Sequence, residues 1–152
     1  MRWSPLAQIQ GTLVLGVARL VAYVLAAFGL VGLLMTGFDY FSNVTGIPFL
    51  MFTINPNTNV IHLVTGLVGI EMTGRADLAR RYLLLVGALG LPWAVVGYFV
   101  EGTMADVFGR NPALVHFHLG VSLVALLLVL WPRWPVLPPT QPTADPVDGG
   151  SI

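Results

Sequence analysis

The sequence contains no cysteine, which excludes a whole set of structures and chemistries. A chain without cysteine forms no disulfide bond, has no thiolate nucleophile and holds no cysteine-ligated zinc or iron–sulfur centre. Charges are also scarce, because Asp, Glu, Lys and Arg together make up 9% of the 152 residues, whereas a soluble domain carries about 25%. The formal net charge is zero, so nothing in the charge balance favours binding to nucleic acid.

Apolar residues take the place of the missing charges. They make up 56% of the chain, and the mean hydropathy is +0.82. So few charged groups cannot cover a surface that faces water. The composition therefore predicts an integral membrane protein of one domain, whose first partner is the lipid bilayer.

Four apolar runs predict an all-α protein in which four transmembrane helices form a bundle, since a span needs about 20 apolar residues. The predicted spans cover residues 12–37, 57–74, 81–100 and 113–131. The transmembrane domain then occupies residues 1–131. Residues 132–152 are rich in proline and in small or acidic residues, which predicts a disordered tail.

All seven basic residues are arginines, and their distribution predicts how the chain crosses the membrane. Arg2, Arg133 and the arginines within residues 75–81 fall on one side, whereas Arg110 falls on the other. Cytoplasmic loops are enriched in arginine and lysine, so this pattern places both termini and the tail in the cytoplasm.

Two polar entries into the apolar runs share one pattern. Residues 55–66 and residues 111–120 both read Asn-Pro, followed by His-x-x-x-Gly. Asparagine is a favoured helix N-cap, and proline is favoured at the first helical position. The pattern recurs in two helix–loop–helix halves of the same orientation. It therefore predicts a parallel pseudo-repeat that places His62 and His116 at the same depth on different helices.

Small and polar residues around these histidines are placed for contact between helices. Asn59, His62 and Gly66 have a spacing that puts them on one helical face. Gly66 and Gly120 each follow a histidine by one turn and allow two backbones to approach closely. In this interpretation His62 and His116 cap or bridge helices through hydrogen bonds near the membrane surface.

Three charged residues lie inside or beside the predicted spans: Arg19, Glu71 and Arg75. Arg19 either extends to the cytoplasmic headgroups or lies buried and pairs with an acid, and the sequence leaves both alternatives open. Ionisable groups within a membrane are functional candidates. A small transporter or channel with Arg19 and Glu71 along its path is therefore one alternative function.

Four segments resemble the bacterial membrane family called domain of unknown function 4383. They read GLLMTGF at 32–38, NPNTNVIHLVTGLVG at 55–69, ARRYL at 79–83 and LVHFHLG at 114–120. The similarity spans roughly residues 10–131. It implies a four-helix fold in a bacterial plasma (inner) membrane and implies no activity.

The histidine motifs are the most specific part of this resemblance, and they map onto His62 and His116 with the glycines that follow them. The sequence departs from the family at Thr58, where the family often has histidine, so one family histidine is missing. His118 is an additional histidine. The missing residue weakens any expectation of a three-histidine metal site.

These features predict a small non-catalytic protein, an accessory or scaffold subunit that packs with other membrane subunits and carries no cofactor. No Ser-His-Asp order, His-Glu-x-x-His motif or carboxylate pair falls within the spans, so no enzyme activity is expected. The main alternative is haem b or a metal bound by His62 and His116. Asp39, Asp106 or His118 would complete a metal site.

Overall fold

The computed structural model describes residues 5–38, 46–101 and 111–131, together with Phe41, Thr103 and Phe108. In order along the chain, these residues form α1 (Pro5–Thr36), β1 (Ile47–Phe49), β2 (Phe52–Ile54), α2 (Pro56–Met72), α3 (Ala76–Val100) and α4 (Pro112–Leu130). The predicted disorder of residues 132–152 lies outside this part of the chain, as do Asp39, Asp106 and Arg110.

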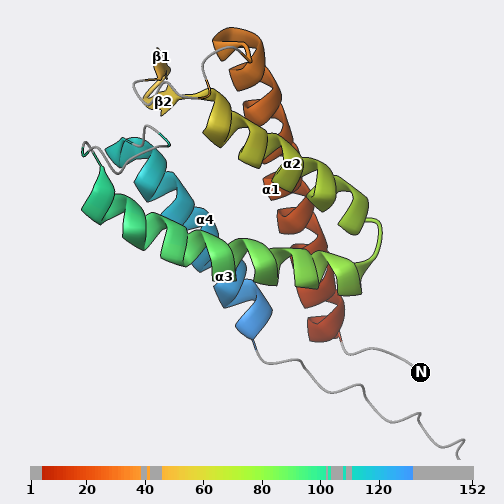
Figure 1. The fold of residues 1–152 in the computed structure, drawn as a ribbon. Coiled ribbons are helices and arrows are strands. Elements are labelled where there is room, and N and C mark those ends of the chain that lie inside the picture. The colour runs from red at the N-terminus through yellow and green to blue at the C-terminus, as the bar shows by residue number, and fades with distance from the viewer. Residues whose placement is uncertain are drawn as a thin grey trace, which may run out of the picture.

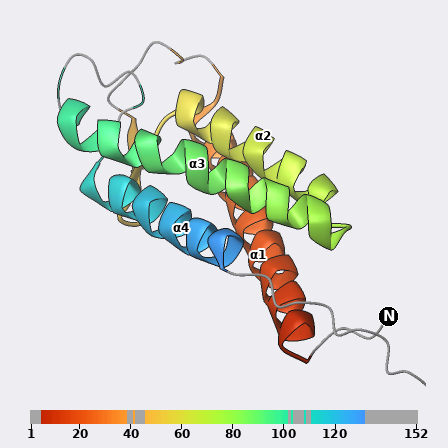
Figure 2. The same ribbon diagram turned by 90° about the horizontal axis from the view of Figure 1, so that it is seen from below.

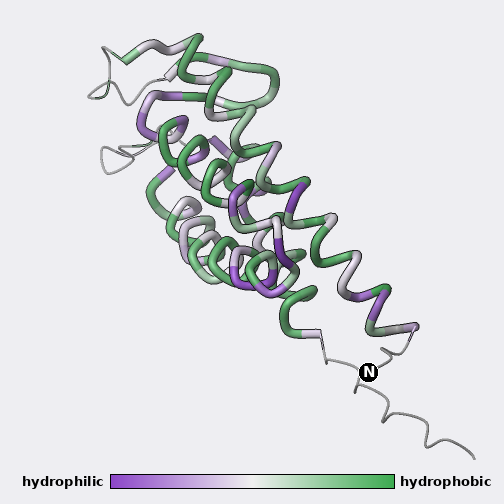
Figure 3. The backbone as a smooth tube through the Cα atoms, turned by 90° about the vertical axis from the view of Figure 1, so that its right-hand side faces the viewer, coloured by the Kyte–Doolittle hydropathy of each residue, from purple (hydrophilic) through white to green (hydrophobic). Residues whose placement is uncertain are grey.

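Three of these helices are long and apolar enough to cross a membrane: α1 from residue 7 to residue 36, α3 and α4. Hydrophobic residues run along most of their length (Figure 3). Helix α2 has 17 residues and is about 26 Å long, shorter than a hydrocarbon core of about 30 Å. The structure thus supports a membrane protein with three helices of spanning length and a shorter fourth one.

Both Asn-Pro segments begin helices, as the sequence predicts. The Asn55 side chain accepts a hydrogen bond from the backbone N–H of Thr58 at 2.9 Å, and the Asn111 side chain accepts one from Leu114 at 3.0 Å. In each case proline occupies the first helical turn, where its missing N–H leaves no bond unmade. These caps fix the first residues of α2 and α4.

The connection between α1 and α2 contains a β-hairpin. Strand β1 pairs antiparallel with β2, so that Ile47 lies opposite Ile54. The turn is formed by Leu50, which has a φ of 55°, and Met51. Asn111 donates a hydrogen bond to the Met51 carbonyl at 2.9 Å and ties the hairpin to α4. The fold is all-helical as predicted apart from these two short strands, whose isoleucine and phenylalanine residues favour pleated backbone.

Helices α1 and α2 form one closely packed pair, and α3 and α4 form another (Figures 1 and 2). Glycines allow this approach. A Cβ added at Gly66 would lie 2.2 Å from the backbone N of Ala26 on α1, and one added at Gly90 would lie 2.3 Å from Oγ of Ser122 on α4. In a membrane, where lipid is as apolar as leucine, such close contact is what holds helices together.

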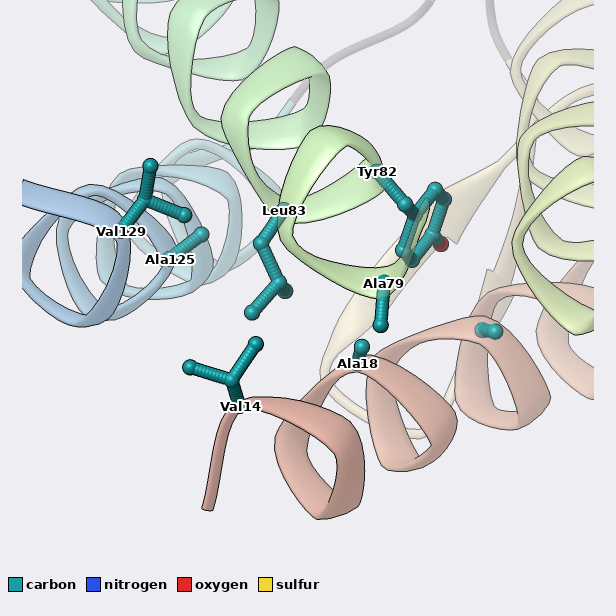
Figure 4. Close-up of a cluster of buried hydrophobic side chains, with 8 residues drawn as sticks. Val14, Ala18, Ala79, Tyr82, Leu83, Ala125 and Val129 are labelled. Carbon is teal, nitrogen blue, oxygen red and sulfur yellow. The ribbon is translucent and has the colours of Figure 1, made fainter. Parts of the chain in front are cut away.

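The apolar core joins the two pairs. In Figure 4, Leu83 of α3 lies toward α1 and α4, whereas Tyr82 points away from α4; both are at most 2% exposed. The other buried members of this cluster are Val14, Ala18, Ala22, Ala79, Ala125 and Val129. Because many of them are alanines, the three helices lie close together at this end of the molecule.

Arg19 and Arg80 each bond to the last turn of a neighbouring helix. Arg19 donates through Nε and Nη2 to the carbonyl of Thr73 after α2, at 3.4 and 3.3 Å. Arg80 donates to the carbonyl of Val129 in α4. The last carbonyls of a helix lack intrahelical partners and carry partial negative charge, so a cation is favoured there. The two alternatives left open for Arg19 are thus replaced by a contact with a backbone carbonyl.

Replacing Arg19 with leucine is expected to lower the free energy of unfolding by about 0.5–1.5 kcal/mol, because the Thr73 carbonyl loses its donors. Arg75→Leu is the matched control. It breaks only the ion pair between Arg75 and Asp77, whose side chains are both exposed. This variant is therefore expected to lower the free energy of unfolding by less. Thermal unfolding in detergent measures both variants. Equal melting temperatures would show that the Arg19 contact contributes nothing beyond a surface charge.

Candidate functional site

Two histidines meet between α2 and α4. The Nε2 atoms of His62 and His118 lie 2.9 Å apart, and the ring planes are inclined by 34°. His62 is 3% exposed. Two imidazole nitrogens at this distance share one proton, so one ring donates through Nε2–H and the other accepts at a bare Nε2.

The two histidines occupy equivalent positions in their helices. His62 follows the cap Asn55 by seven residues, and His118 follows the cap Asn111 by seven residues. At 1.5 Å per residue, each ring is therefore placed about 10 Å along its helix from the end that carries the hairpin. Equal depth on two facing helices is what allows the rings to meet.

His116, which the sequence analysis paired with His62, points elsewhere. It is exposed, its Nδ1 lies 2.5 Å from the Pro112 carbonyl oxygen, and its ring packs edge-on against Tyr98 of α3. Positions 116 and 118 are about 200° apart around a helix, so only one of them can face α2. The residue that faces α2 is His118. Counting from the Asn-Pro caps, rather than matching His-x-x-x-Gly, would have identified it.

The spacing of the pair suits a shared proton. A tetrahedral metal ion bound to both Nε2 atoms at about 2.0–2.1 Å would hold them about 3.3 Å apart, whereas they are 2.9 Å apart. Within the described residues, no three His, Asp or Glu side chains gather in a group that could hold a metal ion. Asp39 and Asp106, suggested as further ligands, lie outside that part of the chain.

Aromatic rings cover the pair on the side of the hairpin. Phe28 of α1 packs edge-on against His62 and against Phe52 of β2, each with ring centroids 5.3 Å apart. Phe117 of α4 packs against Phe52 with centroids 5.9 Å apart. The rings of Phe28, Phe52 and Phe117 therefore form an apolar layer over the histidines on the side of the hairpin.

A cavity of about 330 Å³ lies beside the histidines, between α2, α3 and α4. Its lining carries no Asp, Glu, Lys or Arg. The lining residues are Leu25, Ile61, His62, Val64, Thr65, Val68, Tyr82, Leu85, Val86, Leu89, Gly90, Trp93, Phe117, His118, Val121 and Ser122. Apart from the two histidines, the lining side chains with polar groups are those of Thr65, Tyr82 and Ser122 and the indole N–H of Trp93.

The cavity opens between α2 and α3. Val64 on α2 and Leu85 and Leu89 on α3 line it, yet these side chains are 54%, 50% and 69% exposed. Residues that both line a cavity and remain exposed lie at its mouth. The mouth is apolar, and α3 on one side of it is long and apolar enough to cross a membrane.

The polar atoms of the lining include Nδ1 of His62 and the hydroxyl of Tyr82. Both are buried without a hydrogen-bond partner among the residues that the structure describes. A buried polar group left unpaired costs about 1–3 kcal/mol. A ligand or water that reaches these atoms would therefore gain binding energy.

The remaining predicted site residues take different places. Asn59 and Gly66 lie on the buried face of α2, where the Asn59 side chain donates to the Thr36 hydroxyl at 3.2 Å. Gly120 is exposed on α4, and a Cβ added there meets nothing within 4 Å. Close packing within the chain therefore involves Gly66 and not Gly120.

The charged candidates lie away from the cavity. Glu71 is exposed at the end of α2, and Arg75 forms an exposed ion pair with Asp77 at 3.2 Å. Arg19 contacts the carbonyl after α2. None of them lines the cavity, so the structure does not bring these charges together with the histidine pair.

The comparisons with known proteins identify the family. A family model described as a domain of unknown function (DUF4383) matches residues 14–131. No curated protein and no solved structure shows a significant match. The matched range contains both Asn-Pro caps and both histidines of the pair, and it covers most of the chain. This chain therefore belongs to the DUF4383 family.

Proposed function

We propose that this protein is a non-catalytic integral membrane protein that binds an uncharged, largely apolar molecule of the bilayer beside the histidine pair. The cavity carries the proposal, because it opens toward lipid, has no charged lining and contains a buried Nδ1 without a described partner. Ligand sites are commonly pockets of about 300–1,000 Å³ with apolar walls and a few polar groups. The cavity falls at the small end of that range.

The proposed topology places both termini in the cytoplasm of a bacterial inner membrane, with α2 as a fourth, short span. Gln10 donates to the Trp131 carbonyl at 3.3 Å, so the start of α1 and the end of α4 share one end of the molecule, opposite the hairpin (Figure 1). Arg75, in the turn before α3, and Arg80 and Arg81, near the start of α3, lie toward that same end. Enrichment of arginine on the cytoplasmic side supports this orientation.

A parallel pseudo-repeat is part of the same proposal. Thr73 and Val129 each follow their cap asparagine by 18 residues, and each carbonyl accepts from an arginine of the preceding helix. His62 and His118 are equivalent in the same count. Two halves related by an axis along the membrane normal would bring equivalent residues together at that axis, as the two Nε2 atoms are.

The topology can be tested with introduced thiols, because the chain has no cysteine of its own. We expect a membrane-impermeant maleimide to label Leu50→Cys, at the 82% exposed hairpin tip, on intact cells. Asp77→Cys, in the first turn of α3, is expected to react only after the membrane is permeabilised. The reverse labelling pattern would contradict the proposed orientation.

An accessory role within a larger membrane assembly is the second proposal. It is supported by Gly120, which leaves a smooth exposed site on α4 with nothing within 4 Å of an added Cβ. Exposed glycine on a membrane helix allows the backbone of another helix to approach. The binding cavity opens between α2 and α3, so a partner seated on α4 would leave its mouth free.

Ligand binding is tested with a photoreactive probe, a long-chain alcohol that carries a diazirine near its hydroxyl. In membranes that contain the protein, we expect it to label cavity residues, of which Phe117 and Val121 mark the interior. The double variant Val64→Phe/Leu89→Phe fills the mouth with larger side chains. It is expected to reduce this labelling at least tenfold.

The matched control for the mouth variant is Leu20→Phe, which enlarges a side chain that is 63% exposed on α1 away from the cavity. Its labelling of the interior is expected to equal that of the wild type. Labelling that is confined to exposed helix faces in the wild type would contradict the proposed function. So would interior labelling that the mouth variant leaves unchanged.

A further inference from the structure

The walls of the cavity suit a flat ring. Trp93 of α3 and Phe117 of α4 both line it, together with the imidazoles of His62 and His118. Aromatic rings pack favourably against one another in offset or edge-on arrangements. A planar head group therefore gains contacts here that a branched or flexible head group of the same size would not.

The histidine pair can serve either a donor or an acceptor on that ring. When Nε2 of His62 donates to His118, a neutral His62 has a bare Nδ1 that accepts a hydrogen bond. When Nε2 of His62 accepts, its Nδ1 carries the hydrogen and donates. The tautomer of His62, which is coupled to that of His118 through the contact at 2.9 Å, thus decides which kind of oxygen Nδ1 of His62 can bind. When the hydrogen of this contact moves from one Nε2 to the other, both rings stay neutral because Nδ1 of His62 gains a hydrogen and Nδ1 of His118 loses one. A hydroxyl and a carbonyl are both accommodated.

The rest of the ligand follows from charge and volume. None of the lining residues is charged, and a buried charge without a partner is strongly disfavoured, so phosphate and carboxylate head groups do not fit. A volume of about 330 Å³ holds a ring and the first part of a chain. The apolar mouth between Val64 and Leu89 leads a single chain directly into lipid.

Resting on the proposed function, we infer that the ligand is a quinone that carries an apolar chain, and that the site binds its oxidised and reduced forms alike. The ring lies between Trp93 and Phe117, one ring oxygen bonds to Nδ1 of His62, and the chain leaves between α2 and α3. The carbonyl of the quinone accepts a hydrogen bond from Nδ1–H of His62, and the hydroxyl of the quinol donates one to the bare Nδ1. No electron transfer is involved.

The test is competition against the diazirine alcohol at Phe117 and Val121, with decylubiquinone, decylubiquinol and plain decanol as competitors in the same membranes. For each ring compound, the concentration that halves the labelling is expected to be at least tenfold lower than that for decanol. The half-maximal concentrations of decylubiquinone and decylubiquinol are expected to agree within about threefold. If neither ring compound outperforms decanol while labelling persists, the quinone inference falls and the proposed function stands. If only one redox form competes, the shared-proton argument is overturned.

Histidine variants locate the effect. His62→Phe is expected to keep the interior labelling and lose the preference of the ring compounds over decanol. His116→Phe changes an exposed histidine on the far side of α4 and is expected to keep that preference. His118→Gln is the second variant of the pair. The glutamine amide cannot exchange its donor and acceptor atoms as the imidazole does, so the concentration of quinone or of quinol needed to halve the labelling is expected to rise about tenfold for at least one of the two forms. A preference that survives both His62→Phe and His118→Gln would overturn the assignment to this pair.

Discussion

Replacing Gly66 with leucine is expected to separate α1 from α2 and to produce the largest loss of stability of any substitution considered for this chain. An added Cβ would lie 2.2 Å from the backbone N of Ala26, 2.6 Å from its Cα and 2.8 Å from the carbonyl oxygen of Ala22. These are backbone atoms of a facing helix, so no side-chain rotation relieves the clash. Overpacking in a close-packed interior costs about 1–3 kcal/mol and occasionally more; here we expect more than about 3 kcal/mol.

The matched control is Gly120→Leu, because the sequence gives both glycines the same His-x-x-x-Gly context. A Cβ at Gly120 meets nothing within 4 Å, so the purified chain is expected to melt as the wild type does. Thermal unfolding in detergent compares the two variants. If Gly66→Leu has the melting temperature of the wild type, α1 and α2 do not make the close contact at Gly66.

Gly120→Leu also tests the accessory role in native membranes. If a partner helix approaches α4 at this glycine, the variant is expected to run in a smaller cross-linked assembly although its own fold is unchanged. An assembly of unchanged size would contradict the idea that a partner packs on this site.

The starts of α2 and α4 were predictable because they depend on neighbours in the sequence. An Asn-Pro pair supplies the N-cap oxygen and the preset backbone angle of the first turn, and both caps form at Asn55 and Asn111. The apolar runs likewise predict helices for a physical reason, since lipid offers no partner for backbone groups. These parts of the fold need no knowledge of tertiary contacts.

The partner of His62 depends on how two helices face each other, which local pattern does not determine. The His-x-x-x-Gly match selected His116 because Gly120 follows it, but this glycine makes no contact within 4 Å. His118 has no glycine one turn later. It has Ser122, against which Gly90 of α3 packs. The small residue at that contact is thus supplied by the opposite helix.

The cavity was not predictable at all. It exists because α2 and α3 touch only near the short turn that joins them and diverge toward the hairpin end (Figure 1). The angle between α2 and α3 depends on how each of them packs against another helix. Gly66 lies where α2 approaches α1, and Gly90 lies where α3 approaches α4. Sequence spacing shows which residues are small, but not which gap they leave elsewhere.

The second large effect is expected at the histidine pair. His62→Leu removes one partner of a buried hydrogen bond and leaves Nε2 of His118 without it. An interior polar group that loses its partner costs about 1–3 kcal/mol, so we expect a loss of that size. The same loss is expected for His118→Leu, measured as thermal or denaturant unfolding in detergent.

The double variant His62→Leu/His118→Leu is expected to be more stable than the sum of the single losses predicts, by about 1 kcal/mol or more. Replacing both partners with apolar groups leaves no polar atom unpaired at this contact. His62→Leu combined with His116→Leu is the control, and its effects are expected to add because His116 faces away from the pair. Additive losses for His62 and His118 would show that the 2.9 Å contact does not couple them.

If the two leucines restore most of the stability, the fold does not need a polar pair at this depth. An apolar pair would then hold α2 against α4 nearly as well, without placing polar groups in an apolar environment. What the leucine pair lacks is the shared proton, and with it the nitrogen of His62 that can turn from acceptor to donor beside a cavity open to the bilayer. A double variant that folds but no longer distinguishes quinone from decanol would therefore assign the two histidines to the ligand rather than to the helices.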